Sequence, residues 1–377
     1  MIHMWRALGS KPEGERLARV QQSPNHRNGV FRNALTNRED IAAALGQMMR
    51  GGAQRSPAEP LTVVRRTRED YAKPPVDGLR VTWFGHSSIL IEIDGKRILT
   101  DPVWGPRTSP SPFFGPKRFH PMPLALEELP PLDAVLISHD HYDHLDFPTI
   151  QQLAGTDVPF YVPLGVGAHL AYWGIEEHRI IEMDWWQEAT LDQVRLVFTP
   201  ARHFSGRGLK RDRTLWGSWS LVGPQHRVFF SGDSGMFPGF SEIGERLGPF
   251  DITLMESGAY NGAWPDVHMG PEQAVQAHRM VRGKLLIPVH WGTFSLAAHA
   301  WTEPAERILV AAEKKGVRVF IPRQGERVLP GQVPAQQRWW PDIAWQTADQ
   351  APVLSTALPE ALRGELASDL PVAAPSK

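Results

Sequence analysis

Residues 138–146 read SHDHYDHLD and decide the fold, because this stretch holds three histidines and three aspartates within nine residues. An apolar run, DAVLI at residues 133–137, precedes it and has the length of a buried strand. Burying imidazole and carboxylate groups is costly unless they are paired or bind a metal. The stretch therefore predicts a metal site at the end of a strand.

The spacing within this stretch suits two metal ions. In extended backbone, residues two apart point to the same side, so His139 and His141 can converge on one ion. The chain then turns, and Asp143 and His144 point elsewhere, toward a second ion. Asp146 comes just before Pro148 at a predicted helix start, and we interpret it as the helix N-cap and not as a ligand.

Three further polar residues follow apolar, strand-like runs. They are His203 after VFTPAR, Asp233 after VFFSG and His290 after LLIPV. Side chains at the ends of strands meet in the loops that form sites in layered folds. Asp233 stands between Gly232 and Ser234, and these small neighbours allow metal and backbone to approach closely. Its carboxylate is placed to bridge both ions.

Composition excludes several classes of function. The chain has 377 residues and no cysteine, which rules out disulfides, thiolate zinc ligands and cysteine nucleophiles. The net charge of −1 gives no indication of a nucleic-acid partner. The first 20 residues contain no apolar core of signal-peptide length, so a cytoplasmic location is the default expectation.

Short strand-like runs alternate with helical patterns over the middle of the chain. Helices are expected from about Asp146, from Pro271 to about Val281 and from Pro304 to about Lys315. Together these elements predict layered α/β architecture, with sheets sandwiched between helices. The strand-like runs are residues 79–85, 87–93, 96–102, 133–138, 158–163, 194–200, 218–223, 226–233, 251–257 and 285–292.

The composition divides the chain into three parts. A main domain spans residues 77–328, a polar N-terminal extension spans 1–76, and a Pro/Ala/Gln-rich C-terminal extension at 329–377 ends in a partly disordered tail. The N-terminal extension contains one predicted helix between a capping box at Thr36 and Glu39 and a stop at Gly51. Its apolar face carries Ile41, Leu45 and Met48. This helix either packs on the main domain or forms an amphipathic surface beside a lipid-accessible site.

These residues carry a family resemblance. The pattern His139-x-His141-x-Asp143-His144, with His203, Asp233 and His290 following in that order, resembles the metallo-β-lactamase superfamily over about residues 78–328. Five segments are similar to the N-acylphosphatidylethanolamine phospholipase D branch and its bacterial relatives. They are WFGHSSILIEIDGKRILTDPVW (83–104), LWGSWSL (215–221), GDSGMFPGF (232–240), HMGPEQAV (268–275) and PVHWGTF (288–294).

The resemblance implies a four-layer αββα sandwich and a divided ligand set. It implies that one ion is bound by His139, His141 and His203, that the other is bound by Asp143, His144 and His290, and that Asp233 bridges them. Thiolate-using β-lactamases place a cysteine at the second ion. Since this chain has no cysteine, β-lactam hydrolysis is disfavoured.

Five imidazoles and two carboxylates favour two zinc ions, with manganese and iron as alternatives. Two ions about 3.5–4 Å apart would lower the pKa of a bound water from about 15.7 toward about 7. We therefore expect a metal-bridged hydroxide to attack a phosphodiester, with Asp143 and Asp233 in the catalytic centre. The favoured reaction is phospholipase D-type cleavage of an N-acylphosphatidylethanolamine-like phospholipid.

Several residues are candidates for binding or supporting the substrate. His268 could contact the phosphate or protonate a leaving alkoxide, or it could be a structural residue at a helix start. Arg207, with Arg202, Lys210, Arg211 and Arg213, belongs to a cationic loop that either attracts a phosphate or is simply solvated. Tyr260 is a candidate pocket wall. His86 and Asp101 stand where they could support the ligands, and Asp101 could orient a ligand imidazole.

Two other functions remain open at this point. The same ions could hydrolyse a small soluble lactone or cyclic phosphodiester, and a protein of this fold could be a non-catalytic metal-binding regulator. Peripheral contact with a membrane and an oligomeric state are likewise left open by the sequence.

Overall fold

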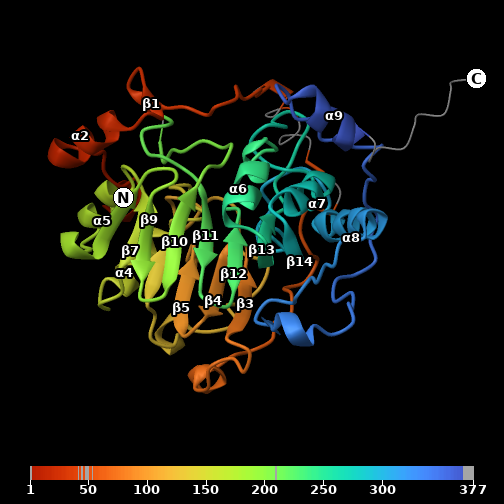
Figure 1. Ribbon diagram of the computed structural model, residues 1–377, viewed down its shortest axis with the longest axis horizontal. Coiled ribbons are helices and arrows are strands. Elements are labelled where there is room, and N and C mark those ends of the chain that lie inside the picture. Colours follow the sequence, from red (N-terminus) through yellow and green to blue (C-terminus); the bar gives the residue numbers. More distant parts are fainter. Residues whose placement is uncertain are drawn as a thin grey trace, which may run out of the picture.

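The computed structural model describes residues 2–40, 42–43, 46, 51–52, 54–208 and 210–367. Two sheets lie face to face, and helices cover their outer surfaces (Figure 1). This arrangement confirms the predicted α/β fold with αββα layers. Each of the ten predicted strand-like runs overlaps a strand of one of these two sheets.

The first sheet has seven strands. Its strands β3, β4 and β5 pair antiparallel, whereas β5 to β8 pair in parallel. Asp94 and Gly95 join β4 to β5 with positive φ angles of 47° and 86°, as a tight hairpin turn requires. In spatial order the strands are β15 (Arg327–Val328), β3 (Leu79–Gly85), β4 (Ser88–Ile93), β5 (Lys96–Thr100), β6 (Ala134–Leu136), β7 (Phe160–Pro163) and β8 (Ile180–Met183).

The second sheet has six strands, of which β12, β13 and β14 are parallel and β9 to β12 are antiparallel. Consecutive parallel strands end at the same edge, so the loops that follow them meet there. In spatial order the strands are β14 (Gly283–Val289), β13 (Phe250–Glu256), β12 (Arg227–Phe230), β11 (Ser218–Val222), β10 (Val194–Thr199) and β9 (Glu188–Leu191).

Helices α4 (Phe147–Leu153) and α5 (Gly167–Tyr172) cover the first sheet, whereas α6 (Gly239–Leu247), α7 (Pro271–Met280) and α8 (Glu303–Lys315) lie over the second (Figure 1). The three helices predicted in the main domain are therefore confirmed as α4, α7 and α8. Asp146 caps α4 by accepting a hydrogen bond from Thr149 N, as predicted. Helix α6 was not predicted. Within the described residues, no helix has the length and apolar character needed to cross a membrane.

The core consists of two layers that the strand alternation separates. Ile89 and Ile91 of β4 point into the layer between the sheets, where they join Trp219 and Leu254 of the second sheet. Leu90, between those two isoleucines, points the other way, into the layer that also contains residues of α4 and α5. Both faces of β4 are thus buried, and the strand is held rigidly beneath the loops that follow it.

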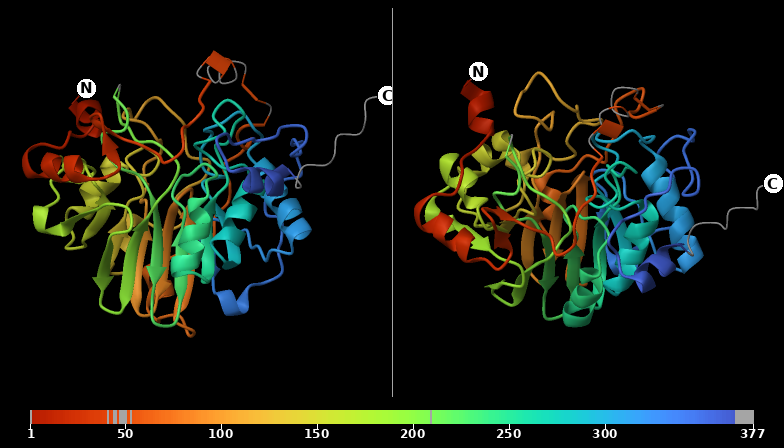
Figure 2. Two further views of the ribbon diagram at one scale, coloured as in Figure 1. Left: turned by 45° about the horizontal axis from the view of Figure 1, so that its top comes forward. Right: turned by 90° about the horizontal axis from the view of Figure 1, so that it is seen from above.

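The first helices of the N-terminal extension and the helix of the C-terminal extension lie on different sides of the sandwich (Figure 2), whereas other residues of the two extensions line one cavity together. The N-terminal extension forms α1 (Ile2–Ala7), α2 (Gly14–Gln22) and a hairpin of β1 (His26–Arg27) and β2 (Val30–Phe31). The C-terminal extension adds α9 (Glu360–Ala367), and 3₁₀ turns occur at Arg68–Tyr71, Leu126–Glu128, Glu177–Arg179 and Pro330–Gln332. The apolar face predicted at Ile41, Leu45 and Met48 lies outside the described residues, as do residues 368–377. The described part of the predicted tail contains α9. The domain boundaries stay a prediction.

Arg202 joins both extensions to the main domain. Its guanidinium is 1% exposed and lies 3.0 Å from Asp266 Oδ1. It also donates hydrogen bonds to the carbonyl oxygens of Thr36 and Thr356, which belong to the N-terminal and C-terminal extensions. The prediction that Arg202 could attract a substrate phosphate does not fit this position, because the charge is neutralised inside the protein.

We predict that Arg202→Met lowers the free energy of unfolding by about 3–5 kcal/mol, because it leaves the Asp266 carboxylate buried without its partner. Urea denaturation measures this change. The control is Arg211→Met, which removes a half-exposed cation that pairs with Glu39 at 2.7 Å in the same loop. This exposed pair should contribute less than about 1 kcal/mol, and equal losses in the two variants would contradict the account.

Candidate metal centre

The predicted ligands all follow the ends of strands. Strands β6, β10, β12 and β14 end at Leu136, Thr199, Phe230 and Val289, and the ligand residues come one to eight residues later. Their side chains converge between the two sheets. The ligand set is His139, His141, Asp143 and His144 after β6, His203 after β10, Asp233 after β12 and His290 after β14.

The first cluster consists of three imidazoles. His141 Nδ1 lies 2.8 Å from His139 Nε2 and 3.3 Å from His203 Nε2. One nitrogen from each ring lies within 4.8 Å of the others, a spacing that could accommodate a single ion. The structure thus brings together the three residues that the resemblance assigns to one ion.

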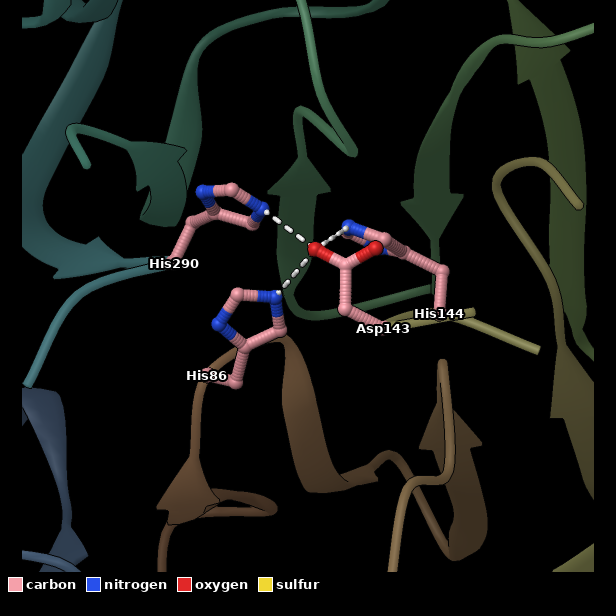
Figure 3. Close-up of side chains that lie close together, drawn as sticks. All are labelled: His86, Asp143, His144 and His290. Atoms are coloured by element: carbon pink, nitrogen blue, oxygen red, sulfur yellow. Dashed lines mark hydrogen bonds and ion pairs between the residues drawn. The ribbon is translucent and has the colours of Figure 1, made fainter. Parts of the chain in front are cut away.

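The second cluster gathers around the carboxylate of Asp143 (Figure 3). Asp143 Oδ2 lies 3.3 Å from His290 Nε2 and 3.5 Å from His144 Nε2. His86 Nε2 donates a hydrogen bond of 2.9 Å to the same oxygen. His86 therefore lies inside the cluster, against a ligand carboxylate.

Asp233 stands between the two clusters. Its Oδ2 lies 3.1 Å from both His144 Nε2 and His290 Nε2, and 3.8 Å from both His139 Nε2 and His203 Nε2. One carboxylate oxygen therefore contacts rings from both sides. This is the position that a bridging ligand would occupy.

The electrostatics of the centre favour positive charge. Burial opposes the ionised form of Asp233, but the nearby His144 and His290 hold the pKa of this carboxyl well below its usual range. Burial alone would lower the pKa of His290. The charges and hydrogen bonds of Asp233 and Asp143 have the larger effect and raise this pKa to about 10. Without metal, the carboxylates of Asp143 and Asp233 thus keep neighbouring imidazoles protonated. Metal binding would release these protons.

Unpartnered buried atoms show that a metal fits. His144 Nε2 and Asp233 Oδ1 are buried, and within the described part of the chain neither makes a hydrogen bond. Such atoms are costly to bury unless an ion or ordered water satisfies them. The His/Asp clusters are compatible with a dinuclear metal site, and their nitrogen-rich donor set suits zinc, iron or manganese.

Further hydrogen bonds hold the rings in place from behind. Asp101 Oδ2 lies 2.7 Å from His144 Nδ1, and His203 Nδ1 donates a 2.7 Å hydrogen bond to the carbonyl oxygen of Val267. In both rings the Nδ1 contact leaves Nε2 directed at the centre, and bonds of this kind fix ring orientation in metal sites. Asp101 occupies the orienting position that the sequence predicts for it.

Left-handed backbone orients three of these side chains. His86, Asp101 and His290 immediately follow strands β3, β5 and β14, and their φ angles are 54°, 35° and 66°. Left-handed backbone at residues other than glycine costs on the order of 1–3 kcal/mol each and persists where the surroundings enforce it. His290 N also donates to the carbonyl oxygen of His86 at 3.0 Å, which joins the two sheets directly at the centre.

The predicted substrate residues have different surroundings. His268 lies beside both clusters, with ring centroids 5.1 Å from His203 and 5.3 Å from His290. Tyr260 lines a cavity of about 660 Å³, and its hydroxyl donates to Glu303 Oε1 at 2.8 Å. Its ring therefore forms part of a cavity wall, while its hydroxyl is occupied within the protein.

Arg207 supports the metal-binding loop from within. Its guanidinium is buried and donates to the carbonyl oxygens of Ala7, Asp140 and Leu145 at 2.7–3.0 Å. It also lies 4.2 Å from the centroid of the Tyr142 ring. These contacts argue against the predicted role of Arg207 in substrate binding and assign it to the fold.

Sequence reasoning missed two buried carboxylates. Asp140 accepts hydrogen bonds from Gly206 N at 2.6 Å and Thr214 Oγ1 at 2.9 Å, so it fixes the loop that follows His203. Glu256 ends strand β13 next to His268 and His290. The signal for Glu256 was present, because it is a polar residue at the end of an apolar strand, like Asp233 and His290.

Comparison with known proteins establishes the family. A family model described as a beta-lactamase superfamily domain matches residues 96–291. The chain belongs to the beta-lactamase superfamily. It is thereby a metallo-hydrolase of this superfamily with candidate His/Asp metal sites, and the resemblance stated from the sequence is confirmed.

Individual relatives give finer detail. The chain is 48% identical over 344 residues to an uncharacterized protein of Mycobacterium tuberculosis, covering 89% of this chain and 91% of that protein. It is 36% identical over 245 residues to N-acyl-phosphatidylethanolamine-hydrolyzing phospholipase D 1 of Caenorhabditis elegans, covering 61% and 69% of the two chains. A novel metallo hydrolase from Ignicoccus hospitalis has a similar fold, with a TM-score of 0.53, 24% identity and coverage of 66% and 97%.

We predict that Asp101→Asn weakens the binding of the ion held by His144 by about 10–100-fold, because His144 loses the anionic acceptor of its Nδ1–H. Competition with a zinc chelator measures this affinity. Asparagine tolerates the left-handed backbone, so the substitution tests the hydrogen bond and not the strain.

Asp94→Asn is the matched control. Asp94 also has a positive φ angle, 47°, and also contacts a histidine, with Oδ1 2.6 Å from His226 Nδ1. It lies in the β4–β5 hairpin turn and is in neither metal cluster. This variant should keep the wild-type metal affinity, and a loss equal to that of Asp101→Asn would contradict the assigned role of Asp101.

Proposed function

We propose that this chain is a dinuclear metal-dependent phosphodiesterase that cleaves an N-acylphosphatidylethanolamine-like phospholipid in the manner of a phospholipase D. The observation that carries the proposal is the contact of one Asp233 oxygen with imidazoles of both clusters. The similarity to the Caenorhabditis elegans enzyme directs the choice of substrate.

The residues divide into two ligand groups. In this proposal one ion is held by His139, His141 and His203, the other by Asp143, His144 and His290, and Asp233 belongs to both. When bound, the two ions supply an activated water and neutralise charge on the phosphoryl oxygens. Zinc is the proposed metal, with manganese and iron as alternatives.

The exposure of the ligands indicates where the substrate enters. Most ligand side chains are buried, but His141, Asp143 and His268 are partly exposed. A phosphodiester must therefore approach the face that these three residues share. At this face His268 can donate a hydrogen bond to a phosphate oxygen or pass a proton to the leaving alkoxide.

Apolar side chains on the surface support peripheral contact with a lipid surface. Trp5 is 64% exposed, and Phe113 and Phe114 are 77% and 76% exposed. Exposed aromatic residues are suited to the boundary between lipid headgroups and acyl chains. A phospholipid substrate would be drawn from such a surface.

We expect the zinc-loaded protein to hydrolyse N-acylphosphatidylethanolamine in vesicles and bis-p-nitrophenyl phosphate. Asp233→Asn should lower kcat/KM by about 10³-fold or more, because the shared ligand contributes several kcal/mol through both ions. Circular dichroism should show that the fold is retained, and Asp94→Asn serves as the active control. Hydrolysis of lactones alone, or unchanged turnover in Asp233→Asn, would contradict the proposal.

A further inference from the structure

Glu256 is a fully buried carboxylate at the edge of the metal centre. It is the last residue of β13, and its side chain is inaccessible to solvent. Met269 N donates a hydrogen bond of 2.7 Å to its Oε1, and Ser234 N donates a longer one of 3.4 Å to the same atom. These two backbone groups, from the loops that carry His268 and Asp233, fix Oε1 as an acceptor.

The other oxygen of Glu256 faces two imidazole rings. Oε2 lies 3.1 Å from His268 Nδ1 and 3.8 Å from His290 Nδ1. His290 Nδ1 is buried and makes no hydrogen bond to any described residue, while His290 Nε2 points to Asp143 and Asp233. A single carboxylate oxygen thus faces both a candidate metal ligand and the residue placed at the substrate face.

We propose that Glu256 is a positioning residue that sets the orientation and tautomer of His290 and His268 together. As an acceptor, Oε2 favours the tautomer with hydrogen on Nδ1 in both rings. It does so through a hydrogen bond to His268 and through its partial negative charge 3.8 Å from His290 Nδ1. Each Nε2 is then free on the opposite side of its ring. For His290 this is the atom that faces the metal centre, and for His268 it lies on the side away from the buried carboxylate. The part of the proposal that concerns His268 rests on the proposed function.

Glu256 complements Asp101 in this arrangement. Asp101 contacts Nδ1 of His144, and Glu256 faces Nδ1 of His290, so two buried carboxylates support two ligands assigned to the same ion. Only Glu256 also contacts a residue of the substrate face. The position of the second ion and the position of His268 are therefore linked through one side chain.

Replacement by glutamine tests the tautomers, because the amide has almost the same shape but different donors. Its oxygen must remain opposite Met269 N, so its NH₂ group faces the two Nδ1 atoms. Both rings are then driven toward the tautomer that carries the hydrogen on Nε2. A histidine cannot bind a metal through a nitrogen that carries hydrogen, so His290 loses affinity.

The first measurement is zinc affinity, which requires no substrate. Glu256→Gln should weaken the more weakly held Zn²⁺ about 10–100-fold in chelator competition, the usual effect of removing an acceptor behind a ligand histidine. Glu92→Gln is the control, because Glu92 is 2% exposed, pairs with Arg80 and lies in neither cluster. Wild-type zinc affinity in Glu256→Gln, or an equal loss in Glu92→Gln, would overturn the proposal for His290.

The second measurement is a double-mutant cycle with bis-p-nitrophenyl phosphate at saturating Zn²⁺. Glu256→Gln and His268→Ala should each lower kcat/KM, by about 10–100-fold, and the double variant should lose no more than about threefold beyond His268→Ala alone. If the losses of the two single variants instead multiply in the double variant, the proposal for His268 is overturned. If the wild-type protein hydrolyses no phosphodiester, the proposed function fails, whereas the zinc measurement still decides the role of Glu256.

Discussion

The contact between Asp233 and four imidazole rings is the constraint on which the rest of the structure depends. The oxygen Oδ2 lies 3.1 Å from His144 and His290 and 3.8 Å from His139 and His203. A buried carboxylate needs nearby positive charge, and these rings need a cation or protons between them. The ends of strands from both sheets must therefore meet within a few ångströms, and the direct hydrogen bond between His290 and His86 holds them there.

The ligand set could be predicted because it depends on local rules. Strands alternate their side chains, so His139 and His141 fall on one side, and polar residues after apolar runs mark loops at a strand end. The cap at Asp146 was equally readable, because a carboxylate before Pro148 is a local signal for a helix start. The glycine beside Asp233 and the hairpin residues at Asp94 are local sequence signals of the same kind. In these cases the relevant partners are near in sequence.

The roles of Arg207, Arg202 and Glu256 depend on partners far away in the chain. Arg207 binds the carbonyl oxygen of Ala7, 200 residues earlier, so a cation that looks solvated in sequence is buried in the fold. Arg202 is neutralised by Asp266, and Glu256 meets His290 only because β13 and β14 lie side by side. No periodicity or spacing encodes these contacts, since they arise from how the layers come together. Only the place of Glu256 at the end of an apolar strand was visible in the sequence.

The central claim is that the two clusters hold one ion each, on either side of Asp233. Anomalous diffraction from crystals of the zinc-loaded protein, recorded above and below the zinc absorption edge, tests it most directly. We expect two difference peaks about 3.5–4 Å apart, one beside His139, His141 and His203 and the other beside Asp143, His144 and His290. A single peak, or two peaks that Asp233 does not contact, would contradict the account.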